Sequence, residues 1–415
     1  MVALLHRTLE RPVSEALARF PIVVLTGPRQ AGKTTLARLV GNRQRNYATL
    51  DDLSMRTAAS RDPEGFVRGL DRPVTLDEVQ RVPELVLAVK KEVDRNRTPG
   101  GFLLTGSASV GVTDGTLESL AGRAAVYRLH PFTESELGGR PGWNPLERLI
   151  DARDAREAGS RFRRRKRPPF DEADLLRGGF PEPSHLLDET GRPVWFEQYR
   201  RTYVERDVPL LVSVGDVSSF TEFVVLCAEE TSRTFNMSRA ASSIGRSVDT
   251  IRRWLGVMQA TFLIDLLPAY GRSARKRLAR SPKLHWTDTG LASHLVGARS
   301  VRDLRDRNLL GPLLETRVFG HLASYAEGMP LPVRIQHYRR HGGEEVDFIV
   351  DLAGRRVPIE LKAGATIAGS DLKGLNGFLD SLRPPRLGIL LYGGEEVMNL
   401  SESIVALPLR VFLGG

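Results

Sequence analysis

Apolar runs alternate with helix-patterned segments through the first third of the chain. The runs cover residues 22–25, 74–76 and 102–105, and residues 46–52 predict a further strand that ends in acidic residues. Such runs are typical of strands buried on both faces, and helical segments between them indicate parallel strands. The sequence therefore predicts an α/β core over residues 1–135, with its closing strand near 129–132. Ligands of such sheets bind at the carboxyl ends of the strands.

A helical lid is predicted for residues 136–214, and it contains a dense basic run over 161–167. Further along, two short helical segments flank Gly245 and an apolar run follows at 261–267, which favours a winged helix-turn-helix of α+β type over 215–300. Polar and basic side chains lie where it would meet DNA: Arg246, Ser247, Thr250, Arg253, Arg272, Arg275 and Arg277. The basic run could grip a nucleic-acid backbone or be a solvated loop. The winged helix could bind DNA or serve only as a packing module between the ATPase and the C-terminal domain.

Two segments of alternating pattern, 345–351 and 356–362, are separated by a four-residue loop and predict a β-hairpin in the last domain, 301–415. Placing Asp351 opposite Arg356 gives two further opposed pairs: Asp347 with Glu360, and Glu345 with Lys362. Opposed carboxylates destabilise a sheet unless a cation lies between them. A divalent metal ion is one such cation.

The strand at 22–25 runs into a segment that fits the phosphate-binding pattern G-x-x-x-x-G-K-[ST] and opens a helix. The predicted nucleotide site comprises Gly27, Pro28, Arg29, Gln30, Ala31, Gly32, Lys33, Thr34 and Thr35. The glycines let backbone amides point at phosphate oxygens, which the helix dipole also favours. We expect Lys33 to reach the β- and γ-phosphates and Thr34 to place its hydroxyl on Mg²⁺.

Two carboxylates follow the strand at 74–76. We expect Asp77 to hold Mg²⁺, directly or through water, and Glu78 to orient or deprotonate the attacking water. Thr105 and Ser107 end the next strand. Either hydroxyl could sense the γ-phosphate, or both could only satisfy the end of the strand.

These motifs resemble those of bacterial and archaeal AAA-type ATPases that carry a C-terminal domain of unknown function, the DUF4143 family. The matching segments are residues 25–35, 76–80, 103–107, 120–123, 281–283, 288–291 and 345–348. The resemblance implies a P-loop AAA+ fold, ATP with Mg²⁺, and a homo-oligomer such as a hexameric ring. It also makes Arg123 a candidate arginine finger for a neighbouring subunit's nucleotide, with a plain surface arginine as the alternative. The hydroxyls at Thr105 and Ser107 depart from the asparagine that AAA-type sites often use as their first sensor.

The C-terminal pattern of Asp347 followed by Glu360 and Lys362 resembles the core of PD-(D/E)xK nucleases, an α/β fold of the restriction-endonuclease type. In that interpretation Asp347 and Glu360 bind Mg²⁺, Glu315 on the preceding helix assists, and Lys362 positions or activates the water. The alternative is a catalytically silent relative held by ion pairs: Glu345 with Lys362, and Asp347 with Arg339 or Arg340.

Net charge, cysteine content and the lack of long apolar stretches limit the possible partners and the cellular location, but they do not identify the function. The 415 residues carry a net charge of +10, which suits a polyanion such as DNA but also plain solubility. One cysteine, Cys227, excludes an intramolecular disulfide, and no apolar stretch has the length of a signal or membrane segment, so we expect a cytoplasmic protein.

The leading hypothesis is a Mg²⁺-dependent ATPase whose nucleotide state controls a DNA-binding winged helix and a nuclease-like domain. Two alternatives stay open. One is an ATP-gated, metal-dependent DNA nuclease. The other is an ATP-dependent protein-interaction switch that does not cleave DNA.

Overall fold

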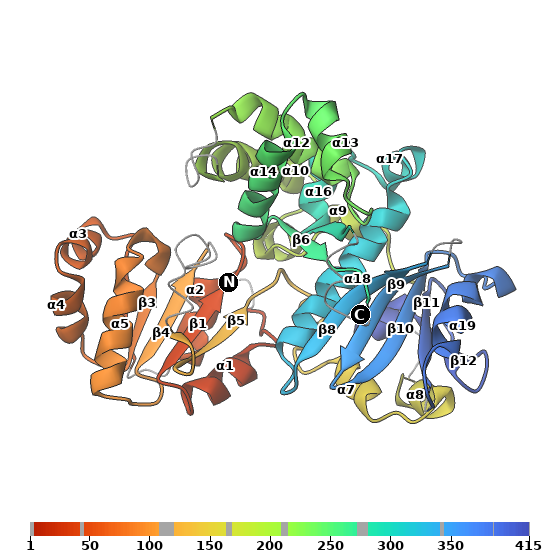
Figure 1. The fold of residues 1–415 in the computed structure, drawn as a ribbon, viewed down its shortest axis with the longest axis horizontal. Helices are drawn as coiled ribbons and strands as arrows, with labels where there is room; N and C mark the ends of the chain where they lie inside the picture. The colour runs from red at the N-terminus through yellow and green to blue at the C-terminus, as the bar shows by residue number, and fades with distance from the viewer. Residues whose placement is uncertain are drawn as a thin grey trace. The chain divides into compact units, whose positions relative to one another are not determined.

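The computed structural model describes residues 4–41, 45–107, 120–162, 168–208, 215–271, 281–340, 344–384 and 386–414 of the chain (Figure 1). The chain forms two compact units. The smaller unit comprises His6–Pro131 with Met258–Leu263, and the larger comprises Met1–Leu5, Phe132–Val257 and Ile264–Gly415. The finer division of the sequence into four domains stays a prediction.

The smaller unit is built on a five-stranded sheet in the order β2-β3-β4-β1-β5 with every pair parallel. Its strands are β1 (Ile22–Thr26), β2 (Asn46–Thr49), β3 (Val74–Asp77), β4 (Phe102–Gly106) and β5 (Ala124–Arg128). Its helices are α1 (Glu10–Leu17), α2 (Lys33–Val40), α3 (Leu53–Arg61), α4 (Pro63–Arg68) and α5 (Glu84–Arg95), with a 3-10 turn η1 (Val79–Arg81). The predicted parallel α/β core is therefore present.

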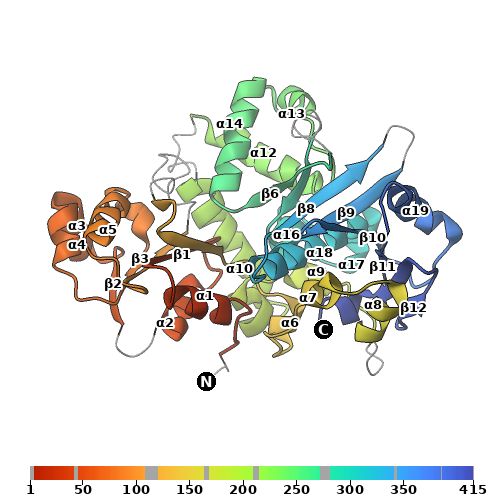
Figure 2. The same cartoon turned by 60° about the horizontal axis from the view of Figure 1, so that its bottom comes forward.

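Two apolar layers cover the sheet because successive side chains of a strand point to opposite faces. Val23 and Leu25 of β1 pack with α1 and α2, whereas Ile22 and Val24 pack with α3, α4 and α5. Figure 2 shows the two groups of helices on opposite sides of the strands.

The strand that closes the sheet is β5, at 124–128 rather than at the predicted 129–132. Residues of β5 are only partly buried, so their pattern is weakly apolar. The stretch after it is more buried but contains Pro131, which has no N–H to donate to a strand ladder.

The larger unit begins with short helices and continues into a three-helix segment. The elements of this part are α6 (Glu134–Leu137), α7 (Pro145–Ile150), α8 (Ala155–Phe162), α9 (Asp174–Arg177), η3 (Glu182–Leu186), α10 (Gly191–Tyr199), η4 (Arg200–Asp207), α12 (Val217–Glu229), α13 (Met237–Ile244), α14 (Val248–Ala260), β6 (Ile264–Leu267) and β7 (Lys283–Trp286). Asn236 caps α13 by accepting from the Arg239 amide, and Gly245 ends it with φ +70°. Trp254 of α14 packs against Phe220 and Phe223 of α12. The predicted pair of helices with glycine at the turn is therefore present, and β6 and β7 pair antiparallel after it.

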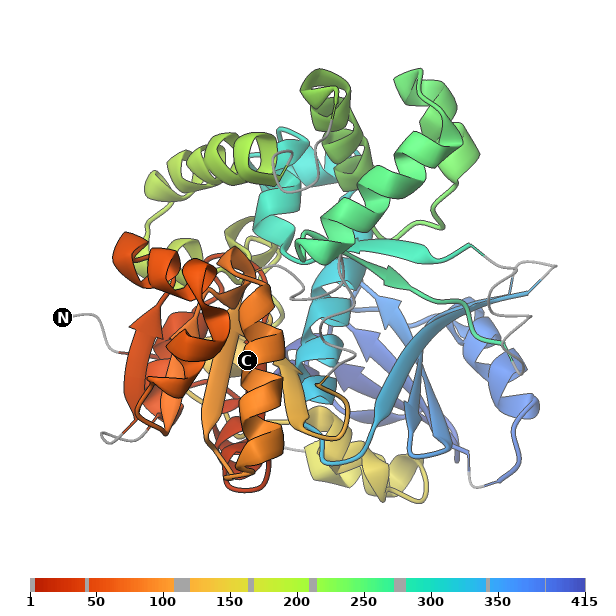
Figure 3. The ribbon, with the colours of Figure 1, turned by 60° about the vertical axis from the view of Figure 1, so that its left-hand side comes forward.

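The rest of the larger unit is a mixed sheet in the order β12-β13-β11-β10-β9-β8, in which β10, β11 and β13 are parallel neighbours. Its elements are α16 (Thr289–Leu295), α17 (Val301–Asp306), α18 (Leu310–Glu327), β8 (Val333–Arg339), β9 (Glu345–Leu352), β10 (Arg355–Lys362), η5 (Gly369–Leu372), α19 (Lys373–Asp380), β11 (Gly388–Tyr392), β12 (Met398–Asn399), β13 (Ile404–Pro408) and α20 (Leu409–Phe412). Phe319 of α18 stacks on Phe348, whereas α19 packs on the face that carries Ile349. The sheet thus lies between α18 and α19 (Figure 3).

The β9–β10 hairpin has the predicted register, with Arg356 opposite Asp351 and Ile359 opposite Phe348. Continuing that register brings Glu360 to Asp347, and the Leu361 amide donates to Asp347 Oδ2 at 3.0 Å. Among the helices of the described residues, none combines the length and apolar character needed to span a membrane.

Candidate functional site

The loop between β1 and α2 has a backbone that only glycine suits at two positions. Gly27 has φ +141°, and a Cβ there would lie 2.3 Å from the Leu129 carbonyl oxygen. Gly32 caps α2 with φ +94°. Both values lie where L side chains are strained, so the two glycines allow the loop to turn tightly into the helix N-terminus.

Lys33, the first residue of α2, is buried inside this loop. Its Nζ donates to the carbonyl oxygens of Gly27 at 3.0 Å and Pro28 at 2.8 Å. Burial lowers the pKa of Lys33 to about 8, although Glu78 and Asp77 act in the opposite direction. The ammonium is therefore already positioned at the loop where phosphate would bind.

Asp77 ends β3 and is held by hydroxyl groups from three other elements. Thr34 Oγ1 of α2 lies 3.3 Å from Oδ2, Tyr47 of β2 donates to the same oxygen, and Thr105 of β4 donates to Oδ1. The carboxylate is almost fully buried. A carboxylate beside a threonine hydroxyl supplies the hard oxygen ligands that Mg²⁺ prefers, so these residues fit that ion.

Glu78 follows in a left-handed conformation, with φ +60° and ψ +43°. Its carboxylate accepts from Gln80 Nε2 and from Ser107 Oγ, the latter at 3.2 Å, and its amide donates to Thr105 Oγ1 at 3.2 Å. Non-glycine residues keep such strained backbone only where their surroundings enforce it, and these positions cluster at functional sites. Thr105 is fully buried, and its contacts position the Asp77 carboxylate and the Glu78 backbone.

Arg7 supports the loop and was not among the predicted site residues. Its side chain is buried and donates to the carbonyl oxygens of Ala31 at 2.9 Å and His130 at 2.5 Å. No motif marks this residue, because its partners are 24 and 123 positions away in the chain.

We expect Arg7→Met to weaken ATP binding by about tenfold, because the Ala31 carbonyl in the loop and the His130 carbonyl after β5 lose a charged donor that contributes ~1.5–3 kcal/mol. Fluorescent-nucleotide titration measures the affinity, and thermal unfolding shows whether the fold is kept. Arg11→Met is the matched control, since Arg11 is exposed and pairs with Glu15 outside the loop. Equal affinity in wild type and Arg7→Met would show that the loop does not need this support.

Arg123 lies at the amino end of strand β5, whereas the phosphate loop lies at the carboxyl ends of the parallel strands. It directly precedes β5, whereas the loop follows β1, and the two strands are parallel. Its Nε donates to Asp94 Oδ1 at 2.5 Å. A contact with the nucleotide of its own chain is therefore excluded, and a contact with a neighbouring subunit stays a prediction.

The residues predicted to meet DNA have different environments. Arg246 is paired with Asp216, and Ser247 caps α14 by accepting from the Thr250 amide at 3.1 Å. Arg253 is exposed on α14. Three predicted wing residues lie outside the described part of the chain: Arg272, Arg275 and Arg277. The same holds for residues 163–167 of the basic run.

In the larger unit, three carboxylates from two elements gather around a lysine. Lys283 Nζ of β7 lies 2.9 Å from Glu315 Oε1 of α18. It also lies 2.8 Å from Glu345 Oε1 and 3.4 Å from Asp347 Oδ1, both of β9. The lysine side chain is only 4% exposed. We call Lys283, Glu315, Glu345, Asp347 and Glu360 the C-terminal charge cluster.

Burial and mutual repulsion shape the acidity of this cluster. Burial, strengthened by the nearby Asp347, raises the pKa values of Glu315 and Glu360. Burial opposes ionisation of Glu345 too, but Lys283 holds the pKa of that carboxyl below its usual value. Glu360 Oε2 has no hydrogen-bond partner among the described residues, which agrees with a neutral acid.

Two ion pairs considered for this region are wrong. Lys362 donates to Asp371 Oδ1 at 2.7 Å and not to Glu345. Asp347 pairs with Lys283, whereas Arg339 and Arg340 contact glutamates.

The metal ligands predicted at Glu315, Asp347 and Glu360 do not fit a divalent ion. Within the described ranges, no group of three or more His, Cys, Asp or Glu side chains could hold a metal ion. The physical reason is that the ammonium of Lys283 lies at their centre. Its charge would repel an incoming divalent ion.

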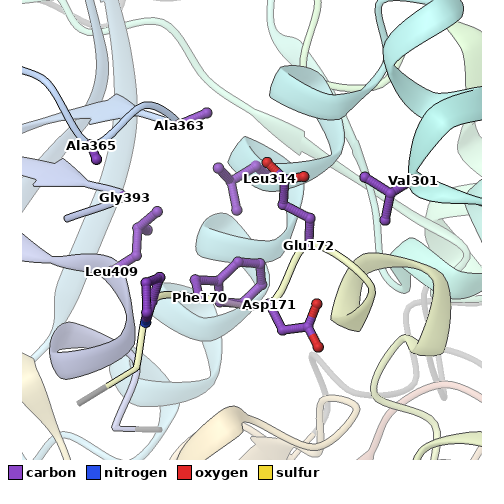
Figure 4. Close-up of a pocket in the computed structure, with 10 residues that line it drawn as sticks. Phe170, Asp171, Glu172, Val301, Leu314, Ala363, Ala365, Gly393 and Leu409 are labelled. Atoms are coloured by element: carbon purple, nitrogen blue, oxygen red, sulfur yellow. The ribbon is translucent and has the colours of Figure 1, made fainter. Parts of the chain in front are cut away.

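A separate pocket of about 410 Å³ opens in the larger unit at the carboxyl ends of the parallel strands (Figure 4). Ala363 follows β10, Gly393 follows β11 and Leu409 follows β13. Asp171 and Glu172 line it from the segment before α9. None of the predicted site residues is among its lining residues, so the pocket has no assigned chemistry.

The strand order and the geometry at Lys33, Thr34, Asp77 and Glu78 define a P-loop ATPase. Residues 19–138 match the family described as AAA domain. Residues 310–412 match the domain of unknown function DUF4143, and residues 172–302 match the domain of unknown function DUF8612.

Two proteins are similar to this chain over most of its length. They are the uncharacterized protein Rv2008c of Mycobacterium tuberculosis (strain ATCC 25618 / H37Rv) and the uncharacterized protein Mb2031c of Mycobacterium bovis (strain ATCC BAA-935 / AF2122/97). Each is 30% identical over 393 residues, which cover 95% of this chain and 81% of the relative. The chain therefore belongs to this family of AAA-type ATPases with a C-terminal DUF4143 domain, as the motifs predicted.

Solved structures give a weaker likeness. The Walker-type ATPase PABY2304 of Pyrococcus abyssi is 15% identical with a TM-score of 0.37, over 69% of this chain and 94% of that one. A point variant of RuvB of Thermotoga maritima is 18% identical with a TM-score of 0.28, over 66% and 94%. Scores this low support no inference, so the fold assignment rests on the strand order, the site and the family match.

Proposed function

We propose that the protein is a Mg²⁺-dependent ATPase whose nucleotide state controls the larger unit, and that DNA is its partner. One observation carries the catalytic part of the proposal. Asp77 and Glu78 are held in fixed positions beside Thr34 by a network of hydroxyl and amide groups. Positioning and charge stabilisation are what phosphoryl transfer requires of a protein.

Each side chain has a role in this proposal. Thr34 and Asp77 would hold Mg²⁺, which when bound neutralises charge on the phosphates. Lys33 neutralises the β- and γ-phosphates, giving up its contacts with the loop carbonyls. Glu78 orients the attacking water and accepts its proton, while Gln80 and Ser107 fix the direction of the Glu78 carboxylate.

Control of the larger unit is supported by the segment that follows β5. In the smaller unit, the Leu129 amide donates to Thr26 at 2.8 Å and the His130 carbonyl accepts from Arg7, so this segment is attached to the phosphate loop. In the larger unit, Glu134 is bonded to α18 through Arg317 and His321. Three residues separate His130 from Glu134, so a shift of the loop is transmitted to α18 along a short stretch of backbone.

The DNA part of the proposal is supported by the helix pair of α13 and α14 and by the exposed Arg253. We expect duplex DNA to bind with an affinity that falls steeply with salt, measured by fluorescence anisotropy. Replacing Arg272, Arg275 and Arg277 by alanine should lower the slope of log affinity against log salt by up to about 3, since each phosphate contact contributes ~0.9.

Arg302→Ala is the control for charge removal, because Arg302 is exposed on α17 and is not one of the residues predicted to meet DNA. A binding slope that is equal in the triple variant and in Arg302→Ala would remove the wing from the proposal. Absence of salt-dependent DNA binding in the wild type would favour the protein-interaction switch.

A further inference from the structure

Lys283 is the only cation at the centre of the C-terminal charge cluster among the described residues. Its nitrogen lies within 2.8–3.4 Å of oxygens from Glu315, Glu345 and Asp347. An ammonium group has three hydrogen-bond donors, which matches three carboxylate acceptors. Each hydrogen-bond donor of the Lys283 ammonium can therefore be matched with one carboxylate.

The backbone on either side of Lys283 is fixed as well. Lys283 pairs with Leu267 in the β6–β7 ladder and forms a further bridge with Thr234. The Asp347 carboxylate is held from its other side, since Oδ2 accepts from the Leu361 amide. The lysine and its carboxylate partners therefore come from separate elements, and the backbone of Lys283 is fixed by its strand pairing.

We infer that Lys283 supplies the cation that the opposed carboxylates of the β9–β10 hairpin require, so that the C-terminal domain takes no divalent metal ion at these residues. An oxygen-ligated divalent ion needs contacts of about 2.0–2.6 Å to the same carboxylates, and the ammonium already lies between them. Metal-dependent cleavage at Asp347 and Glu360 is therefore not part of the proposed function.

The cluster has a positive role in the fold. Lys283 belongs to β7, which is joined through β6 to the helix pair of α13 and α14. Its carboxylate partners belong to α18 and the mixed sheet. The ion pairs therefore fasten the helix-turn-helix segment to the DUF4143 domain and keep two parts of the larger unit together.

Full-length protein carrying Lys283→Ala tests the inference, with Mn²⁺ as the probe and electron paramagnetic resonance as the readout. We expect one more bound Mn²⁺ per chain in Lys283→Ala than in wild type, because the carboxylates then lack their cation. The added site should disappear in the double variant Lys283→Ala/Asp347→Asn. Arg339→Ala is the matched control: it removes an exposed cation 3.9 Å from Glu345, and we expect no added site.

Lys283→Met keeps most of the side-chain volume and removes the charge together with the three hydrogen-bond donors of the ammonium. We expect it to lower the unfolding temperature of the larger unit by at least about 5 °C, while EDTA leaves that of the wild type unchanged. The inference is overturned if wild-type protein has a Mn²⁺ site that Asp347→Asn abolishes, or if Lys283→Met unfolds at the wild-type temperature. ATPase activity, which depends on the smaller unit, is measured in parallel, so that failure of the proposed function is recognised separately.

Discussion

Glu78→Gln is expected to bind ATP with nearly wild-type affinity and to hydrolyse it ~10²–10⁴-fold more slowly, the usual contribution of a positioned general base. Glutamine keeps the size of the side chain and can still contact Ser107, but it cannot accept the proton of the attacking water. The left-handed backbone at residue 78 fixes the direction in which the side chain leaves the main chain, and the substitution leaves this direction unchanged. A phosphate-release assay for kcat and a nucleotide titration for affinity separate the two effects.

Ser107→Ala is the matched control for Glu78→Gln. It removes one contact to the Glu78 carboxylate and leaves the one from Gln80, so we expect a loss of about tenfold or less. If Glu78→Gln hydrolyses ATP at the wild-type rate, Glu78 is not the base, and the water must be oriented by another group. If Glu78→Gln also loses ATP binding, the substitution has disturbed the nucleotide site, and the slower hydrolysis does not support Glu78 as the general base.

The nucleotide site could be predicted because its chemistry is local in the sequence. The loop, Lys33 and Thr34 lie within eight consecutive residues. Asp77 and Glu78 could be predicted because they end an apolar strand downstream of the glycine loop, and parallel strands end at a common edge of the sheet. The hairpin register was also predictable, since the short loop between Leu352 and Arg355 leaves few ways to pair the strands.

The long-range cations could not be predicted in the same way. Arg7 meets His130 across 123 positions and Lys283 meets Asp347 across 64. Each lies in an ordinary sequence environment, and only the packing of separate elements brings it to its partners. The hairpin pattern did show that a cation must separate the opposed carboxylates, but not that a lysine from β7 supplies it.

Glu134, Arg317 and His321 form a buried network whose parts depend on one another. Arg317 donates to Glu134 Oε1 at 2.6 Å, and both side chains are at most 5% exposed. His321 Nε2 accepts from the Glu134 amide, and its Nδ1 donates to the Arg317 carbonyl oxygen. Each nitrogen of the neutral ring is therefore used.

Arg317→Met is expected to lower the free energy of unfolding of the larger unit by up to ~3–5 kcal/mol. The buried carboxylate of Glu134 then loses its closest cation and keeps only Arg177 at 3.4 Å and Arg410 at 3.9 Å. Urea unfolding followed by tryptophan fluorescence measures the loss. The double variant Arg317→Met/Glu134→Gln should recover part of it, since both charges are then gone. No recovery would mean that Arg317 acts mainly through packing.

The pH dependence of stability tests the same network independently. Burial, with the charge of Arg317, lowers the pKa of His321 to about 3, so the folded protein keeps the ring neutral. Although burial favours the neutral acid, Arg317 holds the pKa of Glu134 below its usual value. Both groups bind more protons when unfolded, so their stabilisation is complete above about pH 6.5 and is lost as the pH falls, first through His321 and below about pH 4.5 also through Glu134.

The same variant separates hydrolysis from its transmission to the larger unit. The proposed path runs from the phosphate loop through residues 129–134 to α18, and Arg317 is its anchor on that helix. In wild type we expect ATP to change the hydrogen exchange of the α18 amides. In Arg317→Met that change should be lost while nucleotide affinity stays within about threefold of wild type, because Lys33, Asp77 and Glu78 all belong to the smaller unit and Arg317 to the larger. A preserved exchange response in a folded Arg317→Met protein would show that the nucleotide signal follows another route.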